Sequence, residues 1–347
     1  GSGRVRYFPS CEYQGDGRFV SLLSDEKYSV SFKKEVDATY MNVVVPSKRP
    51  PPFSLEGAAK CAPLNDLPVL SQKYNDFVIV GAGKTAIDAV LKKKKNDLNP
   101  EKISWIMPRD SWILDRAQIQ PTIESIGTAL ATQIIPGSQS DDIDDFFDKI
   151  SKAGGLLRID DNVKPEMYRC STVTKAELEQ LKRVKNIIRK GRVKSIGDTE
   201  IILEQGSIAT TLETLHIDCA GDGLAKRPAT PIFRGQKITL QSVRTCQQVF
   251  SPGRLGYVEA TYQDDETKNK LCKPVPHPNT DIDFLKNNVA DAVNIERWAK
   301  EPRLKNWLQK SRLNFESHIL NASPMIKMLS VLSKIPFLRL SKKADEA

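Results

Sequence analysis

The sequence predicts an α/β fold with a largely parallel sheet. Between Phe77 and about Ala220, short apolar runs alternate with segments of helical periodicity, the pattern of strands joined by crossover helices. A glycine turn, Gly81-Ala82-Gly83, directly follows the first of these runs, and the next run begins one βαβ unit further along the chain. With 347 residues, of which 39% are hydrophobic, the chain is long enough for two or three domains.

The elements of this central region follow from the same pattern. The expected helices run from the glycine turn to about Lys95 and from about Asp141 to Ala153. The expected strands are Phe77–Val80, Ile103–Met107, Ile201–Leu203 and Leu215–Asp218.

The region before it is predicted to be β-rich. Ser47–Pro52, with three consecutive prolines, favours an extended linker, and Leu55–Lys73 is expected to be irregular. Glycine and serine turns separate the strands of a predicted β-meander, which are Val5–Phe8, Phe19–Leu23, Tyr28–Phe32 and Val36–Tyr40.

After Pro228 the pattern becomes mixed. A strand is expected at Ile238–Leu240, with a helix beginning near Val243. Two further helices are expected, at Ile282–Ile295 and Arg303–Leu320, and a tail from Ser323 has the pattern of an amphipathic helix packed on the body of the protein.

The glycine turn has the chemistry of a pyrophosphate site. Gly81 permits a tight turn out of the strand, and Gly83 lets backbone amides approach a phosphate with no side chain in the way. A small residue, Ala86, lets the following helix pack close to the sheet, and the amides at the helix start face the phosphate charge. The sequence therefore predicts a dinucleotide site at Gly81, Ala82, Gly83, Lys84, Thr85 and Ala86.

The end of the next strand bears on the choice of cofactor. An NAD site would place an acidic residue there against the ribose 2′-hydroxyl, whereas this chain has Pro108-Arg109. An arginine can pair with a 2′-phosphate, so Arg109 favours NADP. The alternative is a surface arginine paired with Asp110 or Asp115.

A nucleoside triphosphatase is the main rival. Gly83-Lys84-Thr85 matches the end of a phosphate-binding loop, and Leu215-His216-Ile217-Asp218 resembles a strand that ends in a magnesium-binding aspartate. The loop requires a glycine five residues before Gly83, where Val78 stands inside the strand. The missing glycine disfavours this class.

Two longer segments carry a family resemblance. Gly81-Ala82-Gly83-Lys84-Thr85-Ala86-Ile87-Asp88 and Trp105-Ile106-Met107-Pro108-Arg109-Asp110 resemble the NADP domain of flavin-containing monooxygenase-like FAD/NAD(P)-binding oxidoreductases. Val36–Tyr40 and His216–Gly221 are similar to the strand ends at which such proteins cross between their dinucleotide domains. The resemblance implies a Rossmann-type NAD(P)-binding domain inserted in a partial FAD-binding domain with a β-meander.

This resemblance also implies a division of the chain. It comprises a partial FAD-type domain with meander and linker (1–72), a Rossmann-type domain (73–230), a return to the FAD-type domain (231–320) and a tail (321–347). The family's FAD glycine turn is expected near the N-terminus, but Gly15-Asp16-Gly17 lacks the flanking strand and helix. FAD is thus implied by resemblance for a longer parent protein.

The implied activity is hydride transfer from NADPH to FAD and then to oxygen or a small-molecule substrate. Flavin chemistry needs no acid, base and nucleophile signature, and none is present. The alternatives are a flavin-free NADP-dependent reductase and a nucleotide-sensing protein without turnover. Of three histidines, His277 lies in a proline-rich loop that could face a site or form a structural turn, and the three do not cluster as metal ligands would.

Composition restricts partners and compartment. The net charge of +9 suits an anionic ligand, but the run Lys92–Lys95 lies at a predicted helix end and matches no nucleic-acid motif. No apolar stretch is long enough for a membrane span or signal region, so a cytoplasmic protein without integral membrane association is expected. The six cysteines form no CxxC pair, which favours buried thiols and disfavours a disulfide reductase.

Overall fold

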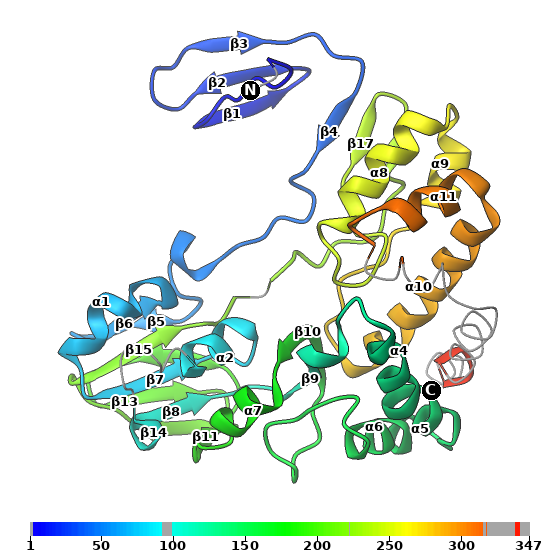
Figure 1. The fold of residues 1–347 in the computed structure, drawn as a ribbon. Coiled ribbons are helices and arrows are strands. Elements are labelled where there is room, and N and C mark those ends of the chain that lie inside the picture. Colours follow the sequence, from blue (N-terminus) through cyan, green and yellow to red (C-terminus); the bar gives the residue numbers. More distant parts are fainter. Residues whose placement is uncertain (1–2, 92–98, 222, 315–316, 318–336, 341–347) are drawn as a thin grey trace.

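A five-stranded parallel sheet is the central element of the computed structural model, which describes residues 3–91, 99–221, 223–314, 317 and 337–340 (Figure 1). The strand order is β11-β8-β7-β15-β6, and every neighbouring pair is parallel. The predicted α/β class and largely parallel sheet are confirmed. The strands are β6 (Lys60–Pro63), β7 (Asp76–Val80), β8 (Ile103–Ile106), β11 (Asn186–Ile188) and β15 (Thr214–Asp218).

The order of the strands reverses beside β7. From β7 the chain passes to β8 and then to β11, on one side, whereas β15 and β6 lie on the other side. Because all five strands are parallel, the carboxyl ends of β7, β8 and β15 lie at the same edge of the sheet. Such a switch point is where open α/β sheets bind ligands.

Strand β7 is buried on both faces, which explains why it reads as an unbroken apolar run. Phe77 and Ile79 belong to a core that also contains residues of α2 (Lys84–Leu91) and α7 (Lys175–Leu181). Val78 and Val80 belong to a second core with a four-stranded sheet on the opposite face. That sheet has the order β14-β13-β12-β5, from β5 (Ser54–Leu55), β12 (Val193–Ile196), β13 (Glu200–Leu203) and β14 (Gly206–Ala209).

The N-terminal meander is confirmed in part. Strands β1 (Cys11–Gly15), β2 (Arg18–Ser21) and β3 (Lys27–Ser29) form an antiparallel sheet. The predicted strand Val5–Phe8 is wrong, and Phe8 packs beside the sheet instead, with its ring 4.7 Å from that of Phe19. The last predicted strand leaves the meander: β4 (Glu35–Asp37) pairs in parallel with β17 (Lys237–Thr239).

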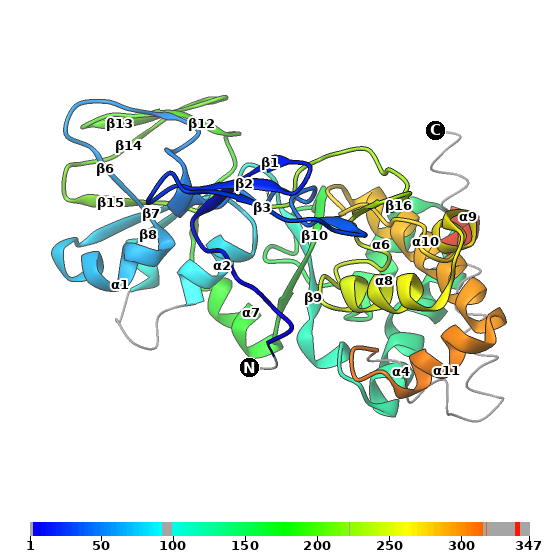
Figure 2. The ribbon, with the colours of Figure 1, turned by 90° about the horizontal axis from the view of Figure 1, so that it is seen from above.

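An insertion between β8 and β11 joins the sheets to the C-terminal helices. Strands β9 (Ser111–Asp115) and β10 (Met167–Val173) pair in parallel between the two halves of the molecule (Figures 1 and 2). The remaining elements are β16 (Phe233–Arg234) and the helices α1 (Leu67–Leu70), α4 (Ile123–Ala129), α5 (Ile135–Ser138), α6 (Ile143–Lys152), α8 (Phe250–Thr261), α9 (Asp265–Leu271), α10 (Asp281–Lys300) and α11 (Pro302–Lys310).

The chain passes twice between the sheets and the C-terminal helices, and the two connecting segments, the chain crossings, lie side by side. The segment after β4 and the segment after β15 are bridged at Val44 and Gly223, and the Ala225 N–H donates to Met41 O at 2.9 Å. The crossings therefore lie next to each other, although they are far apart in the sequence.

Several local predictions are wrong. Leu55–Lys73 is not irregular, because it contains helix α1 and the edge strand β6, which pairs with β15. Ile201–Leu203 is a strand, but it lies in the antiparallel hairpins of the second sheet. The helix expected near Val243 begins at Phe250, since the Val243 N–H is bound by Ser251 Oγ at 3.1 Å.

The C-terminal predictions are confirmed in part. Helix α10 covers the first expected segment, whereas α11 covers only the first part of Arg303–Leu320, because it ends at Lys310. The run Lys92–Lys95 and most of the tail from Ser323 lie outside the described residues. In the ranges described above, none of the helices is long and apolar enough to cross a membrane.

Candidate functional site

Gly81 lies at the carboxyl end of β7, where it is hydrogen-bonded to β8 and lies close to the end of β15. Its N–H donates to Ile106 O at 2.9 Å, and its carbonyl accepts from Trp105 Nε1 at 2.7 Å. Its φ is +128°, and a Cβ there would lie 2.5 Å from Cys219 O, just beyond β15. Both the backbone conformation and this close approach require glycine.

Gly83 has a different role. Its carbonyl accepts from the N–H groups of Ala86 (3.0 Å) and Ile87 (3.1 Å) and so starts α2. A Cβ on Gly83 would have nothing within 4 Å, because the position faces open space. Packing therefore does not require glycine at this position, but the lack of a side chain leaves the space beside the turn open.

A cavity of about 310 Å³ lies over the carboxyl ends of β7, β8 and β15. We call it the switch-point cavity. Its lining residues are Pro52, Phe53, Val80, Gly81, Ala82, Gly83, Pro108, Arg109, Met167, Arg169, Arg192, Val193, Cys219, Ala220 and Gly221.

Four of the seven predicted site residues line this cavity, namely Gly81, Ala82, Gly83 and Arg109. The other three lie in the first turn of α2. Ala86 is fully buried in the helix–sheet core, Thr85 is exposed, and the Lys84 ammonium pairs with Asp88 one turn along. These three residues belong to the helix start, whereas Gly81, Ala82 and Gly83 of the turn line the cavity.

Arg109 is positioned by the loop before α10. Its Nη2 donates to Asn279 Oδ1 at 3.2 Å, and the same amide oxygen accepts from Arg169 Nε at 3.1 Å. The sequence explains this placement, because Asp283 caps α10 and its Oδ2 accepts from the Asn279 N–H at 2.8 Å. Two guanidinium groups, one from the segment after β8 and one from β10, thereby converge on one amide oxygen beside the cavity.

The carboxylates that the sequence offered to Arg109 are engaged by other groups. Asp110 accepts from Arg189 Nε at 2.8 Å and from Arg189 Nη2 at 3.0 Å. Asp115 Oδ1 accepts from the Ala117 N–H at 3.0 Å. Sequence reasoning missed Arg169 and Arg192, which come from β10 and from the start of β12 and carry no motif of their own.

A second cavity of about 370 Å³ shares Arg169 with the first. We call it the Tyr40 cavity, because Tyr40 and Met41 of the first chain crossing line it. His277 also lines it, and its Nδ1 is buried without a hydrogen-bond partner. Burial, together with the charge of Arg169, lowers the pKa of His277. The proline-rich loop thus brings this histidine to a cavity, one of the two outcomes that the sequence left open.

The residues of the rival triphosphatase motif are engaged elsewhere. Asp218 is buried, and its carboxylate accepts from Arg49 Nη1 at 3.0 Å and from the Ala220 N–H at 2.8 Å. Val78 lies within β7. Among the residues with described positions, no three His, Cys, Asp or Glu side chains gather as a metal site.

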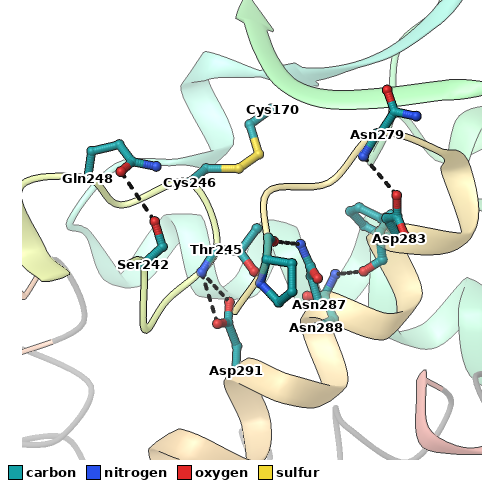
Figure 3. The surroundings of a disulfide bond; sticks show 12 residues. Cys170, Ser242, Thr245, Cys246, Gln248, Asn279, Asp283, Asn287, Asn288 and Asp291 are labelled. Atoms are coloured by element: carbon teal, nitrogen blue, oxygen red, sulfur yellow. Dashed lines mark hydrogen bonds between the residues drawn. A yellow bond between two sulfur atoms is a disulfide. The ribbon is translucent and has the colours of Figure 1, made fainter. Parts of the chain in front are cut away.

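The prediction of six buried thiols holds only for Cys219 and Cys272, because Cys11 and Cys61 are half-buried and the other two cysteines are not thiols. Cys170 and Cys246 form a disulfide across a sequence separation of 76, with their Cα atoms 6.3 Å apart (Figure 3). Disulfide connectivity cannot be deduced from spacing, which is why the sequence did not reveal the pair. Cys219 and Cys272 are buried free thiols, and burial raises the pKa of half-buried Cys61 to about 12.

Fold and site together define an α/β protein with an arginine-lined cavity at the switch point of its parallel sheet. No protein-family profile matches the chain. Proteins of Mycobacterium bovis and of two Mycobacterium tuberculosis strains, each described as uncharacterized, are 45% identical to it over 333 residues. The match covers 92% of this chain and 60% of each relative, so the chain spans about three fifths of their length.

Proposed function

We propose that the chain is the nucleotide-binding part of an NADPH-dependent flavoprotein oxidoreductase of monooxygenase type. The observation that carries the proposal is the switch-point cavity, with the glycine turn on its wall. A pyrophosphate there would receive backbone N–H groups from the turn and from the start of α2, where the helix dipole favours negative charge. Gly83 would allow this approach, because no side chain fills the space beside it.

The charge of the cavity favours NADP over NAD. Three arginines line it, Arg109, Arg169 and Arg192. A 2′-phosphate would add two negative charges and three acceptor oxygens, which guanidinium groups bind in a planar, bidentate manner. Arg109 is the proposed 2′-phosphate ligand, because it follows β8 at the place where an NAD site would carry an acid.

The flavin part of the proposal rests on the family resemblance. The paired crossings after β4 and β15 support a nucleotide domain inserted in a second domain. The described residues do not themselves fit the FAD pyrophosphate, since Gly15-Asp16-Gly17 joins the antiparallel strands β1 and β2 and no helix follows it. FAD is therefore proposed for a longer protein of the length of the mycobacterial relatives.

Anaerobic mixing of the purified full-length protein with NADPH tests this function. The proposal expects bound flavin whose absorbance is bleached by NADPH and returns on exposure to oxygen. A colourless protein with no NADPH-dependent flavin reduction would refute the flavoprotein assignment.

The second candidate is a flavin-free NADP-dependent reductase. The observation that favours it is the lack of an FAD-type glycine turn among the described residues. Tight FAD in the purified full-length protein would exclude it. A protein that binds NADPH but consumes neither NADPH nor oxygen would instead be a nucleotide sensor.

A further inference from the structure

The Cys170–Cys246 disulfide connects the segments that shape both cavities. Cys170 directly follows Arg169, which lines the switch-point cavity and the Tyr40 cavity. Cys246 lies in the loop between β17 and α8, whose residues Gln241 and Ser242 line the Tyr40 cavity. The disulfide, drawn in Figure 3, therefore joins two segments that both line the Tyr40 cavity.

The β10 side of the bond departs from the regular sheet. Pairing with β9 passes from Tyr168–Trp112 to Thr172–Leu114, so that the three residues from Arg169 to Ser171 stand opposite one residue of β9. Cys170 itself has a φ of 57°, in the left-handed region that non-glycine residues rarely occupy. Such a conformation persists only where the surroundings impose it.

The loop side is held by hydrogen bonds to α10. The Thr245 N–H donates to Asp291 Oδ1 at 2.9 Å, and Asn294 Nδ2 donates to Val243 O at 3.0 Å. Cys246 also has a left-handed backbone, with a φ of 58°. Since α10 anchors this loop, the disulfide ties the bulged part of β10 to a fixed support.

We propose that Cys170–Cys246 is a reversible redox site whose reduction loosens the Arg169 wall of both cavities. Both cysteines are half-buried and so within reach of a reductant, whereas Cys219 and Cys272 are buried. The reductant is a dithiol of the thioredoxin type or glutathione. It supplies two electrons, its own thiols become a disulfide, and the S–S bond is replaced by two protein thiols.

A thiol–disulfide titration tests the site itself. The chain is equilibrated in buffers with stepped ratios of reduced to oxidised glutathione, then alkylated and digested. Mass spectrometry follows the disulfide-linked pair of peptides and the two alkylated peptides that contain Cys170 and Cys246. A single, reversible two-electron transition is expected, with Cys61 alkylated or unreactive to the same extent throughout. Free thiols at both positions in air-purified protein, or a bond that dithiothreitol does not cleave in the folded protein, would overturn the proposal.

The consequence for the cavities is tested with NADPH as the probe. Reduction is expected to weaken NADPH binding about tenfold, a usual size for coupling between sites. A Cys170→Ser, Cys246→Ser double variant is expected to bind like the reduced wild type whatever the buffer, while a Cys61→Ser variant responds as the wild type does. An unchanged NADPH affinity after complete reduction would contradict the coupling.

This second test rests on the proposed function, so amide hydrogen exchange provides an independent measurement. Reduction is expected to speed exchange at the amides of residues 169–172, and the double variant is expected to exchange fast in either buffer. If NADPH binds neither form, the proposed function fails and the exchange experiment alone decides the redox coupling. Equal exchange in the oxidised and reduced protein would then overturn it.

Discussion

Replacing Gly83 by alanine separates cofactor binding from folding. The new methyl group meets no atom within 4 Å, and the backbone there has no positive φ, so the substitution causes neither a clash nor backbone strain. Gly83 is the N-cap residue of α2, a position at which alanine is less favourable than glycine, so a small loss of about 1 kcal/mol is expected. The methyl group nevertheless projects into the space through which a pyrophosphate would approach the turn.

The loss of affinity can be estimated from the hydrogen bonds at stake. A phosphate held away from the helix start loses at least one charge-assisted backbone hydrogen bond, worth about 1.5–3 kcal/mol. The expected result for Gly83→Ala is an NADPH dissociation constant raised roughly 10- to 100-fold with a Tm that falls only slightly. NADPH fluorescence titration and thermal unfolding, measured on the same samples, provide the two values.

Gly81→Ala is the matched variant. Its Cβ would lie 2.5 Å from Cys219 O and 2.8 Å from Cys219 C, at a φ of +128°. Backbone strain of about 1–3 kcal/mol, added to a clash that moves the ends of β7 and β15 apart, is expected to lower Tm. If Gly83→Ala keeps the wild-type Kd for NADPH while remaining folded, the reasoning about the pyrophosphate position is refuted.

Three further predictions concern charge, pH and the disulfide. Arg109→Gln is expected to weaken the binding of NADPH roughly 10- to 100-fold and that of NADH little. The control is Arg116→Gln, which removes a guanidinium paired with Glu177. Equal losses of affinity for both cofactors in Arg109→Gln would exclude a 2′-phosphate contact. Burial lowers the pKa of His216 below its usual 6.5, and its ring bonds Lys60 O and Thr210 Oγ1. The unfolded chain then binds the proton more readily, so the free energy of unfolding is expected to fall as pH drops below about 6.5, less steeply in His216→Gln; identical pH profiles would contradict this. Reduction of Cys170–Cys246 is expected to lower the free energy of unfolding by up to about 4.5 kcal/mol, the value that chain entropy gives for a loop of this length. Denaturant unfolding with and without dithiothreitol measures the change. An unchanged midpoint would show that the bond does not constrain the unfolded chain.

Local sequence signals predicted the strand and the glycine turn after it well. Phe77–Val80 is an apolar run because both faces of the strand are buried. The next residue, Gly81, must be glycine because it lies against Cys219 O. The apolar run and the glycine lie within a few residues of each other, although the contact that requires the glycine is made with the distant Cys219. The strand, the turn and the start of α2 could therefore be read without knowledge of the rest of the fold.

The rest of the site depends on contacts between distant segments. Asn279 receives hydrogen bonds from Arg109 and Arg169, at sequence separations of 170 and 110. Arg169 lies in a bulge of β10 that no alternating pattern announces. Such partners are brought together by tertiary packing alone, which single-sequence patterns do not contain.

Short or edge elements were missed for a related reason. Strand β6 has only four residues and ends in proline, and it becomes a strand because β15 pairs with it. The loop before α8 contains apolar residues with helical spacing, but its backbone N–H groups at Val243 and Thr245 are bound by Ser251 and Asp291 side chains. In both cases long-range pairing outweighs local preference.

The most direct test of the central claim is equilibrium binding of NADP⁺ and NAD⁺ to this chain by titration calorimetry. The account predicts saturable binding of one NADP⁺ per chain, tighter than NAD⁺ by about tenfold or more because of the cavity arginines. Folded protein that binds no NADP⁺, or that binds NAD⁺ at least as tightly, would contradict it.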